Sequence, residues 1–256
     1  MSVVTDRINV LTYHAIADGP GPTNIPADTF RGQMLVLREC GYTAISLAEF
    51  AAWHAGEVNL APRSVVITFD DGFASFAKHA FPELAANNWT ATVFLPVAYL
   101  GTEESWLGAD PVPRRLLTWD QVAELASAGI DFGSHSRTHR DLRRLGTDEL
   151  RLELAGSRDE IEHRLKKTPL SFAPPYGRTN RHVREAIGEL YRMSVGTRLQ
   201  RAGRTCNLLD VPRIEMHYFR DLRRWRAYLE GRAEWFFLAR RSLRGIRALA
   251  ASAVGA

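Results

Sequence analysis

The feature that most constrains the fold is an apolar run at residues 65–69 that stops abruptly at Asp70, Asp71 and Gly72. The run consists of β-branched and aromatic residues, which favour a buried strand. Two carboxylates and a glycine cannot continue a buried ladder, so the acids are expected at the carboxyl end of the strand. Side chains alternate between the two faces of a strand, so both acids can serve one site only if the backbone turns, and Gly72 permits that turn. Alone, the tripeptide is more typical of a solvated turn than of a site.

Runs of this kind recur along the chain and alternate with helix signals. Ser46 with Glu49, and Thr118 with Gln121, have the spacing of capping boxes, which mark helix starts. A strand followed by a helix, repeated about seven times, predicts a parallel α/β barrel, and the notable polar residues all follow strands. With 256 residues, the chain is long enough for one such domain. The predicted strands are residues 8–13, 43–45, 65–69, 90–97, 130–134, 171–173, 191–195 and 211–216.

Three further helix signals and one long insertion complete the pattern. Asp28 and Asn180 are each expected to cap a helix through their carboxylate or amide oxygen. A helix over residues 75–87 is interrupted by Pro82. Residues 101–117 are rich in glycine and proline, and this length predicts a lid or a substrate-binding loop.

A second candidate site follows the predicted strand at residues 130–134, where His135 and His139 lie four positions apart. On a helical turn this spacing places both imidazoles on one face, where they can bind one ion, although two exposed histidines on a polar turn are about equally expected from the pattern. A catalytic metal site needs three protein ligands and an open position, and the acid pair can supply the third ligand. One bound and one free aspartate match hydrolysis, in which a metal ion activates water and polarises a carbonyl while a free carboxylate accepts a proton.

A third stretch, residues 172–177, reads Phe-Ala-Pro-Pro-Tyr-Gly and predicts a rigid loop. Its backbone amides, other than those of the prolines, could donate to an oxyanion, and the simpler interpretation is a tight structural turn. His14 ends the first predicted strand, a position where a single histidine is usually structural or solvated. The three stretches together indicate a site more strongly than any one of them does.

In order and separation, these stretches resemble the polysaccharide deacetylase family, also called carbohydrate esterase family 4. The resemblance covers residues 8–215 and implies a distorted (β/α)7–8 barrel, which we expect to span residues 1–219. It also implies a hydrolase that removes N-acetyl groups from a polysaccharide, an oligosaccharide or a lipid-linked sugar. The residues that carry the resemblance are Thr68-Phe69-Asp70-Asp71-Gly72, His135-Ser136 with His139, and Pro174-Pro175-Tyr176-Gly177.

The resemblance also implies roles for individual residues. Asp70 would be the general base, and the loop with Pro175 and Tyr176 would face the oxyanion through the Tyr176 amide. The expected ion is zinc, and the same ligand set would also suit cobalt or nickel. The implied metal ligands are Asp71, His135 and His139.

The chain departs from the family pattern at two points. Where the family commonly has an arginine that supports the base, this chain has Ala173, which leaves the orientation of Asp70 unexplained. The general acid is either His217 or His14. The chain resembles the branch that includes the biofilm poly-N-acetylglucosamine deacetylases, whose motif order is permuted and whose early Tyr-His supplies the acid, so His14 is favoured.

Three other functions compete with this interpretation. A related barrel amidohydrolase acting on a small amide would carry the same catalytic motifs. A carbohydrate-binding homologue without turnover would explain Ala173 and the ambiguous acid. A nucleic-acid binder would rely on residues 220–256, which carry nine arginines and three acids, a local charge of +6. This function is disfavoured because the net charge of +4 then leaves −2 for the other 219 residues.

The two ends of the sequence bear on cellular location and on contact with a membrane. No signal peptide or membrane-spanning run is visible, which predicts a cytoplasmic protein. Residues 220–256 are expected to form a basic helical extension packed on the barrel. The alternative is weak peripheral contact with an anionic membrane, in which the aromatic residues enter the interface and the arginines attract headgroups. The arginines concerned are Arg240, Arg241, Arg244 and Arg247.

Overall fold

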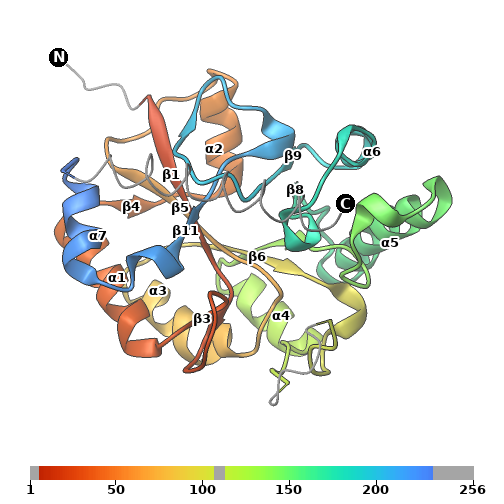
Figure 1. The fold of residues 1–256 in the computed structure, drawn as a ribbon, viewed down its shortest axis with the longest axis horizontal. Coiled ribbons are helices and arrows are strands. Elements are labelled where there is room, and N and C mark those ends of the chain that lie inside the picture. Colours follow the sequence, from red (N-terminus) through yellow and green to blue (C-terminus); the bar gives the residue numbers. More distant parts are fainter. Residues whose placement is uncertain (1–5, 107–112, 233–256) are drawn as a thin grey trace, which may run out of the picture.

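A curled, mainly parallel sheet forms the centre of the computed structural model, which describes residues 6–106 and 113–232 (Figure 1). The strand order is β10-β1-β5-β6-β7-β8-β9, with β11 also pairing with β1 and β4 with β5. Only the β1–β10 pair is antiparallel among the pairs of this sheet in the described ranges. The strands are β1 (Arg7–Tyr13), β4 (Thr43–Ala44), β5 (Ser64–Phe69), β6 (Thr92–Leu95), β7 (Asp131–Ser134), β8 (Ser171–Phe172), β9 (Met193–Ser194), β10 (Ala202–Gly203) and β11 (Ile214–Glu215).

Two details complete the sheet. A single parallel bridge between Val195 and Val211 links the end of β9 to the segment that leads into β11, so the curled sheet nearly closes on itself. A separate parallel pair, β2 (Ala15–Ile16) and β3 (Asn24–Ile25), lies directly after β1 in the chain. The fold is therefore α/β with a barrel-like sheet, as the alternation of strands and helices predicts.

Helices surround this sheet, and most begin where the sequence predicts (Figure 1). The capping boxes at Ser46 and Thr118 are both formed, and the Asn180 side chain accepts from the Val183 amide. The predicted cap at Asp28 is wrong, because Pro26 occupies the N-cap and Asp28 lies in the first turn. The helices are α1 (Ala27–Glu39), α2 (Leu47–His54), α3 (Phe81–Ala86), α4 (Trp119–Ser127), α5 (Thr147–Leu165), α6 (Arg181–Leu190) and α7 (Leu222–Leu229).

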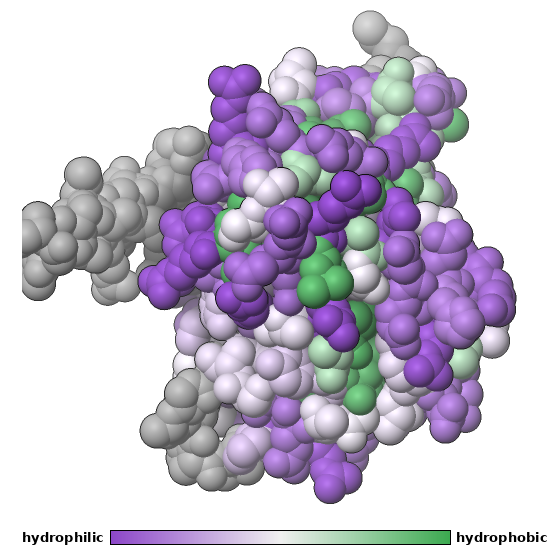
Figure 2. All heavy atoms as spheres, turned by 90° about the vertical axis from the view of Figure 1, so that its right-hand side faces the viewer, coloured by the Kyte–Doolittle hydropathy of each residue, from purple (hydrophilic) through white to green (hydrophobic). Residues whose placement is uncertain are grey.

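The helix predicted around Pro82 has two parts. A π-helical turn at Phe76–Ala80 precedes α3, and Pro82 falls in the first turn of α3, where a missing amide hydrogen costs no intrahelical bond. The face shown in Figure 2 is mostly hydrophilic, with apolar residues in a narrow strip near the middle and in small scattered groups elsewhere. This distribution is expected when amphipathic helices turn their apolar sides toward the sheet.

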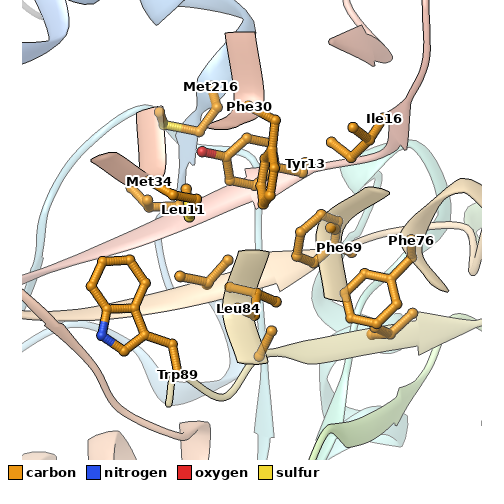
Figure 3. Packing of buried hydrophobic residues seen from close by; sticks show 14 of the residues in the cluster. Leu11, Tyr13, Ile16, Phe30, Met34, Phe69, Phe76, Leu84, Trp89 and Met216 are labelled. Atoms are coloured by element: carbon orange, nitrogen blue, oxygen red, sulfur yellow. The ribbon is translucent and has the colours of Figure 1, made fainter. Parts of the chain in front are cut away.

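A large apolar cluster packs between the carboxyl ends of β1 and β5 and the helices that cover them (Figure 3). The ring of Tyr13 stacks on Phe69 with centroids 5.2 Å apart and meets the edge of Phe30 at 5.1 Å. Tyr13 and Phe69 are also register partners in the β1–β5 ladder, and the Asp70 amide donates to the Tyr13 carbonyl at 2.9 Å. This packing places the residues that follow β1 and β5, His14 and Asp70, beside each other.

The described part of the predicted C-terminal extension packs on the barrel. Helix α7 lies against α1, and Trp225 is fully buried and donates from its indole nitrogen to the Gln33 carbonyl at 3.2 Å. The Tyr228 hydroxyl donates to Asn9 at 2.7 Å. The boundary at residue 219 stays a prediction, and residues 233–256, with the arginines considered for membrane contact, lie outside the described residues. In the described ranges, no helix combines the length and hydrophobicity needed to cross a membrane.

We expect Trp225→Ala to lower the free energy of unfolding by about 3–5 kcal/mol, since it removes a fully buried indole and leaves a cavity. Urea denaturation of the full chain measures this loss. The matched control is Leu152→Ala, whose side chain is 56% exposed on α5 and whose loss should change stability by no more than about 0.5 kcal/mol. Equal stability of the two variants would show that α7 does not contribute to the core.

Candidate active site

The predicted site residues come together at the carboxyl ends of the parallel strands. His14 follows β1, Asp70 and Asp71 follow β5, and His135 and His139 follow β7. All five line one cavity of about 260 Å³. A larger cavity of about 500 Å³ lies at the amino ends of β6, β7 and β8 and contains none of these side chains, so size does not identify the site here. The site is identified instead by the ionisable side chains that line the smaller cavity.

Both acids after β5 reach this cavity because the backbone turns sharply. Asp71 and Gly72 have φ values of 71° and 63°, two consecutive residues in the left-handed region. This turn confirms the conformation predicted from Gly72 and lets adjacent carboxylates face one site. A left-handed aspartate is uncommon, which is consistent with strain retained at a functional position.

Asp71, His135 and His139 form a buried group that fits a metal ion. The Asp71 Oδ1 atom lies 3.2 Å from the Nε2 atoms of both histidines, and the three candidate ligand atoms lie within 4.8 Å of one another. The Nδ1–H of His135 donates to the Ala173 carbonyl at 2.6 Å, which leaves Nε2 with the lone pair that a metal requires. Two imidazoles and one carboxylate are a common catalytic zinc set, and the buried donors here suit it.

The two histidines converge through a loop, and the helical turn predicted from their spacing is wrong. Ser136 and His139 have φ values of 66° and 53°, which no α-helix contains. The buried carboxylate of Glu153, on α5, accepts from the amides of Arg137 at 2.8 Å and Thr138 at 2.7 Å, and also from the Thr138 hydroxyl. Glu153 therefore holds the loop that presents His139.

The sequence contained a signal for Glu153 that the motif analysis missed. Glu153 lies on the buried face of α5 with Leu150, Leu154 and Ile161. A glutamate in an apolar stripe is unusual, because a buried carboxylate must find donors. In this fold the donors are the backbone amides of the His135–His139 loop.

Asp70 is supported by Arg213, a residue that the sequence analysis did not single out. The guanidinium donates to both carboxylate oxygens at 2.7 Å, and its Nε donates to the Gly196 carbonyl at 2.9 Å. Arg213 is 2% exposed and comes from the segment leading into β11. The question left open by Ala173, how Asp70 is oriented without the usual arginine, is answered by an arginine that comes from a different strand. A lone arginine inside the predicted apolar strand at residues 211–216 was the available signal.

The environment keeps both carboxyl groups ionised. Burial raises the pKa of Asp70, but the charge and hydrogen bonds of Arg213 outweigh burial, so the pKa is lowered from its usual value. Burial also raises the pKa of Asp71, and the close contacts of its carboxylate with the imidazoles of His135 and His139 bring it well below the usual range. Asp70 can therefore act as a proton acceptor at neutral pH.

The structure distinguishes the positions of the two candidate acids. The Nε2 atom of His14 lies 3.9 Å from Asp70 Oδ2, and His14 lines the cavity. His217 lies in a short 3-10 helix at Met216–Phe219 and is not among the described residues that line the cavity. Of the two candidates, His14 is the one that lines the cavity together with Asp70, Asp71, His135 and His139.

Aromatic rings form two sides of the metal-ligand group. Trp106 stacks on His139 with centroids 4.3 Å apart, and the edge of Tyr176 meets the same ring at 4.7 Å. Trp106 belongs to the insertion predicted as a lid or substrate loop, of which residues 107–112 lie outside the described residues. Pro175 and Tyr176 form a tight turn in which Tyr176 has a φ of 60° and is 44% exposed.

Comparison with known proteins identifies the class. The sequence profile of the polysaccharide deacetylase family matches residues 57–193, more than half of the chain, and the chain belongs to this family. The structure of the Streptococcus pyogenes deacetylase PplD in complex with acetate superposes with a TM-score of 0.72 at 26% identity, covering 81% of this chain and 91% of PplD. This likeness confirms the predicted barrel type.

Two relatives add to the assignment. The protein YxkH of Bacillus subtilis (strain 168) is 25% identical over 211 residues, which is 82% of this chain and 71% of YxkH. The poly-beta-1,6-N-acetyl-D-glucosamine N-deacetylase of Escherichia coli (strain K12) is 33% identical over 135 residues, 49% of this chain and 20% of that enzyme. The match therefore spans only about a fifth of the E. coli protein.

We expect Arg213→Met to lower the free energy of unfolding by about 3–5 kcal/mol, because it leaves the buried Asp70 carboxylate without its counter-charge. The double variant Asp70→Asn/Arg213→Met removes both charges and should recover a substantial part of the loss. Urea denaturation at neutral pH compares the two. Equal destabilisation of the single and double variants would contradict charge compensation as the role of Arg213.

Proposed function

We propose that this protein is a metal-dependent N-deacetylase that hydrolyses the N-acetyl group of a sugar in a polysaccharide, an oligosaccharide or a lipid-linked glycan. The products would be acetate and a free amine on the sugar. The observation that carries the proposal is one buried cavity in which a two-histidine, one-aspartate group adjoins an ionised, arginine-supported carboxylate. Family membership and the N-deacetylase activity in the name of the E. coli relative support it.

Asp71, His135 and His139 would hold the divalent ion, with zinc as the first choice and cobalt or nickel as alternatives. When bound, such an ion supplies Lewis-acid polarisation of a carbonyl oxygen and lowers the pKa of water. The protein's own contribution is to fix the ligands. Ala173 orients His135 through its carbonyl, and Glu153 holds the loop of His139.

Asp70 would take the proton from the attacking water, with Arg213 holding both carboxylate oxygens in place. As the carbon–nitrogen bond breaks, the leaving amine needs a proton, and His14, whose Nε2 lies 3.9 Å from Asp70 Oδ2, would donate it. The turn at Pro175 and Tyr176 would offer the Tyr176 amide to the developing oxyanion.

The Arg213–Asp70 pair bears on one alternative. A sugar-binding homologue without turnover was suggested by Ala173 and by the uncertain acid. Arg213 supports Asp70 although position 173 is not an arginine, which answers the first reason. His14 lies close to Asp70, which answers the second. An amidohydrolase acting on a small amide stays the alternative that substrate trials must separate.

Acetate release from a panel of N-acetylated oligosaccharides and small amides, with and without a chelator, tests the function. We expect Asp70→Asn to retain metal and to lose about 10²–10⁴-fold in turnover, because the near-isosteric amide cannot accept a proton. His135→Ala should lose metal, as measured by elemental analysis. The matched control is Asp159→Asn, an exposed acid on α5. Chelator-resistant acetate release, or full turnover in Asp70→Asn, would contradict the proposal.

A separate comparison decides the acid. His14→Ala should lower turnover by about 10²–10⁴-fold at unchanged metal content, whereas His217→Ala should stay near wild type. His163→Ala, which changes an exposed histidine on α5, controls for loss of an imidazole elsewhere. A defect confined to His217→Ala would place the acid at the other end of the chain.

A further inference from the structure

A second cavity adjoins the active site. It has a volume of about 310 Å³ and lies between β2, the segment after Gly72 and the two arginines Arg114 and Arg115. Arg114 also lines the active-site cavity, so the two spaces meet at this residue. The chain connects them as well, because β2 begins one residue after His14 and Phe73 lies two residues after Asp71.

The lining of this second cavity has one sign of charge. Its ionisable residues are Lys78, His79, Arg114 and Arg115, and no acid lines it within the described ranges. The chain as a whole has 33 Lys and Arg against 29 Asp and Glu, so the composition does not explain this segregation. We refer to it as the basic cavity. Its other walls include the apolar side chains of β2 and Phe73.

Two of these cations, Lys78 and Arg115, are held less tightly by acids than Arg114 is. Arg114 is held by bidentate contact with the buried Glu104 and stacks 4.1 Å over Phe73, so it serves mainly as a wall. The Arg115 side chain is 82% exposed, and among the described residues its one acidic contact is to Glu103 at 3.6 Å. Lys78 makes no ion pair in the part of the chain that the structure describes.

The walls that carry these cations are well fixed. The Ala74 amide donates to the Arg115 carbonyl at 2.9 Å, and Phe73 bridges to Leu116. The Ile16 amide donates to the Ser75 hydroxyl at 3.0 Å. Lys78 and His79 lie on the π-helical turn at Phe76–Ala80, a conformation that is rare and often found at functional sites. The walls of the basic cavity are therefore fixed by hydrogen bonds, and the cavity lies beside the proposed catalytic residues.

We infer that the basic cavity binds a phosphate ester carried by the same substrate, next to the N-acetylated sugar. Lysine and arginine donors suit a phosphate, and the apolar wall suits the carbon chain of an ester. The inference deepens the proposed function by naming the substrate class as a phosphate-linked glycan. The ester could link the sugar to another sugar or to a lipid carrier, and the shared chemistry is the phosphate.

Calorimetric titration of the metal-loaded full chain with N-acetylglucosamine 1-phosphate, a short alkyl phosphate and neutral N-acetylglucosamine tests this site. We expect both phosphates to bind more tightly than the neutral sugar. Lys78→Ala/Arg115→Ala should weaken both phosphates by about tenfold or more and leave the neutral sugar within about twofold. The control is Arg151→Ala, an exposed arginine on α5 that lines neither cavity.

Kinetics provide the second readout. The double variant should raise KM for an N-acetylated sugar phosphate by about tenfold with kcat unchanged, and leave KM for a neutral oligosaccharide unchanged. Tighter binding of the alkyl or of the sugar phosphate identifies which source of phosphate the cavity favours. Undiminished phosphate binding in the double variant, or no preference for phosphate in the wild type, overturns the inference. Because the titration needs no turnover, it decides this point even if no substrate is deacetylated.

Discussion

The parallel register of β1 with β5 is the constraint on which the rest of the site depends. Five residue pairs, ending at Tyr13 and Phe69, bring the two strands to the same edge of the sheet. The stacked rings of that last pair are anchored in the main apolar cluster. His14 and Asp70 therefore lie side by side, and a shift of one residue in either strand would turn the site residue of that strand away from the cavity.

The buried ion pair of Asp70 and Arg213 keeps the Asp70 carboxylate ionised. An unpaired carboxylate at the depth of Asp70 would become neutral, and a neutral acid cannot accept a proton. Arg213 prevents this, and its Nε anchor on Gly196 ties β5 to the far edge of the sheet, where the curled strands nearly close. The curl of the barrel thus contributes to the site, because it brings the segment after β9, with the Gly196 carbonyl, to the same arginine that holds Asp70.

The sequence predicts those site residues that are marked by their immediate neighbours in the chain. Asp70 and Asp71 come at the end of an apolar run, His135 directly follows a predicted strand, and in parallel folds the carboxyl ends of strands meet. Arg213 and Glu153 could not be placed in the same way, because their partners are 143 and 16 residues away and only the folded topology shows that they meet. The helical turn expected at the histidine pair was wrong for a related reason. Two histidines four positions apart can also converge on a loop that contains left-handed residues, when buried acceptors hold the backbone of that loop.

The loop that presents His139 bears on how the protein would bind the proposed ion. Its shape is set by the Glu153 carboxylate and by the Ser136 hydroxyl, which accepts from the His139 amide at 3.0 Å. These contacts are among protein groups alone, so the ligands are preorganised. Metal affinity is then not reduced by the cost of ordering a segment, and the apoprotein should keep its fold. Removal of the proposed ion would then leave a folded protein, which the ion could reload without refolding.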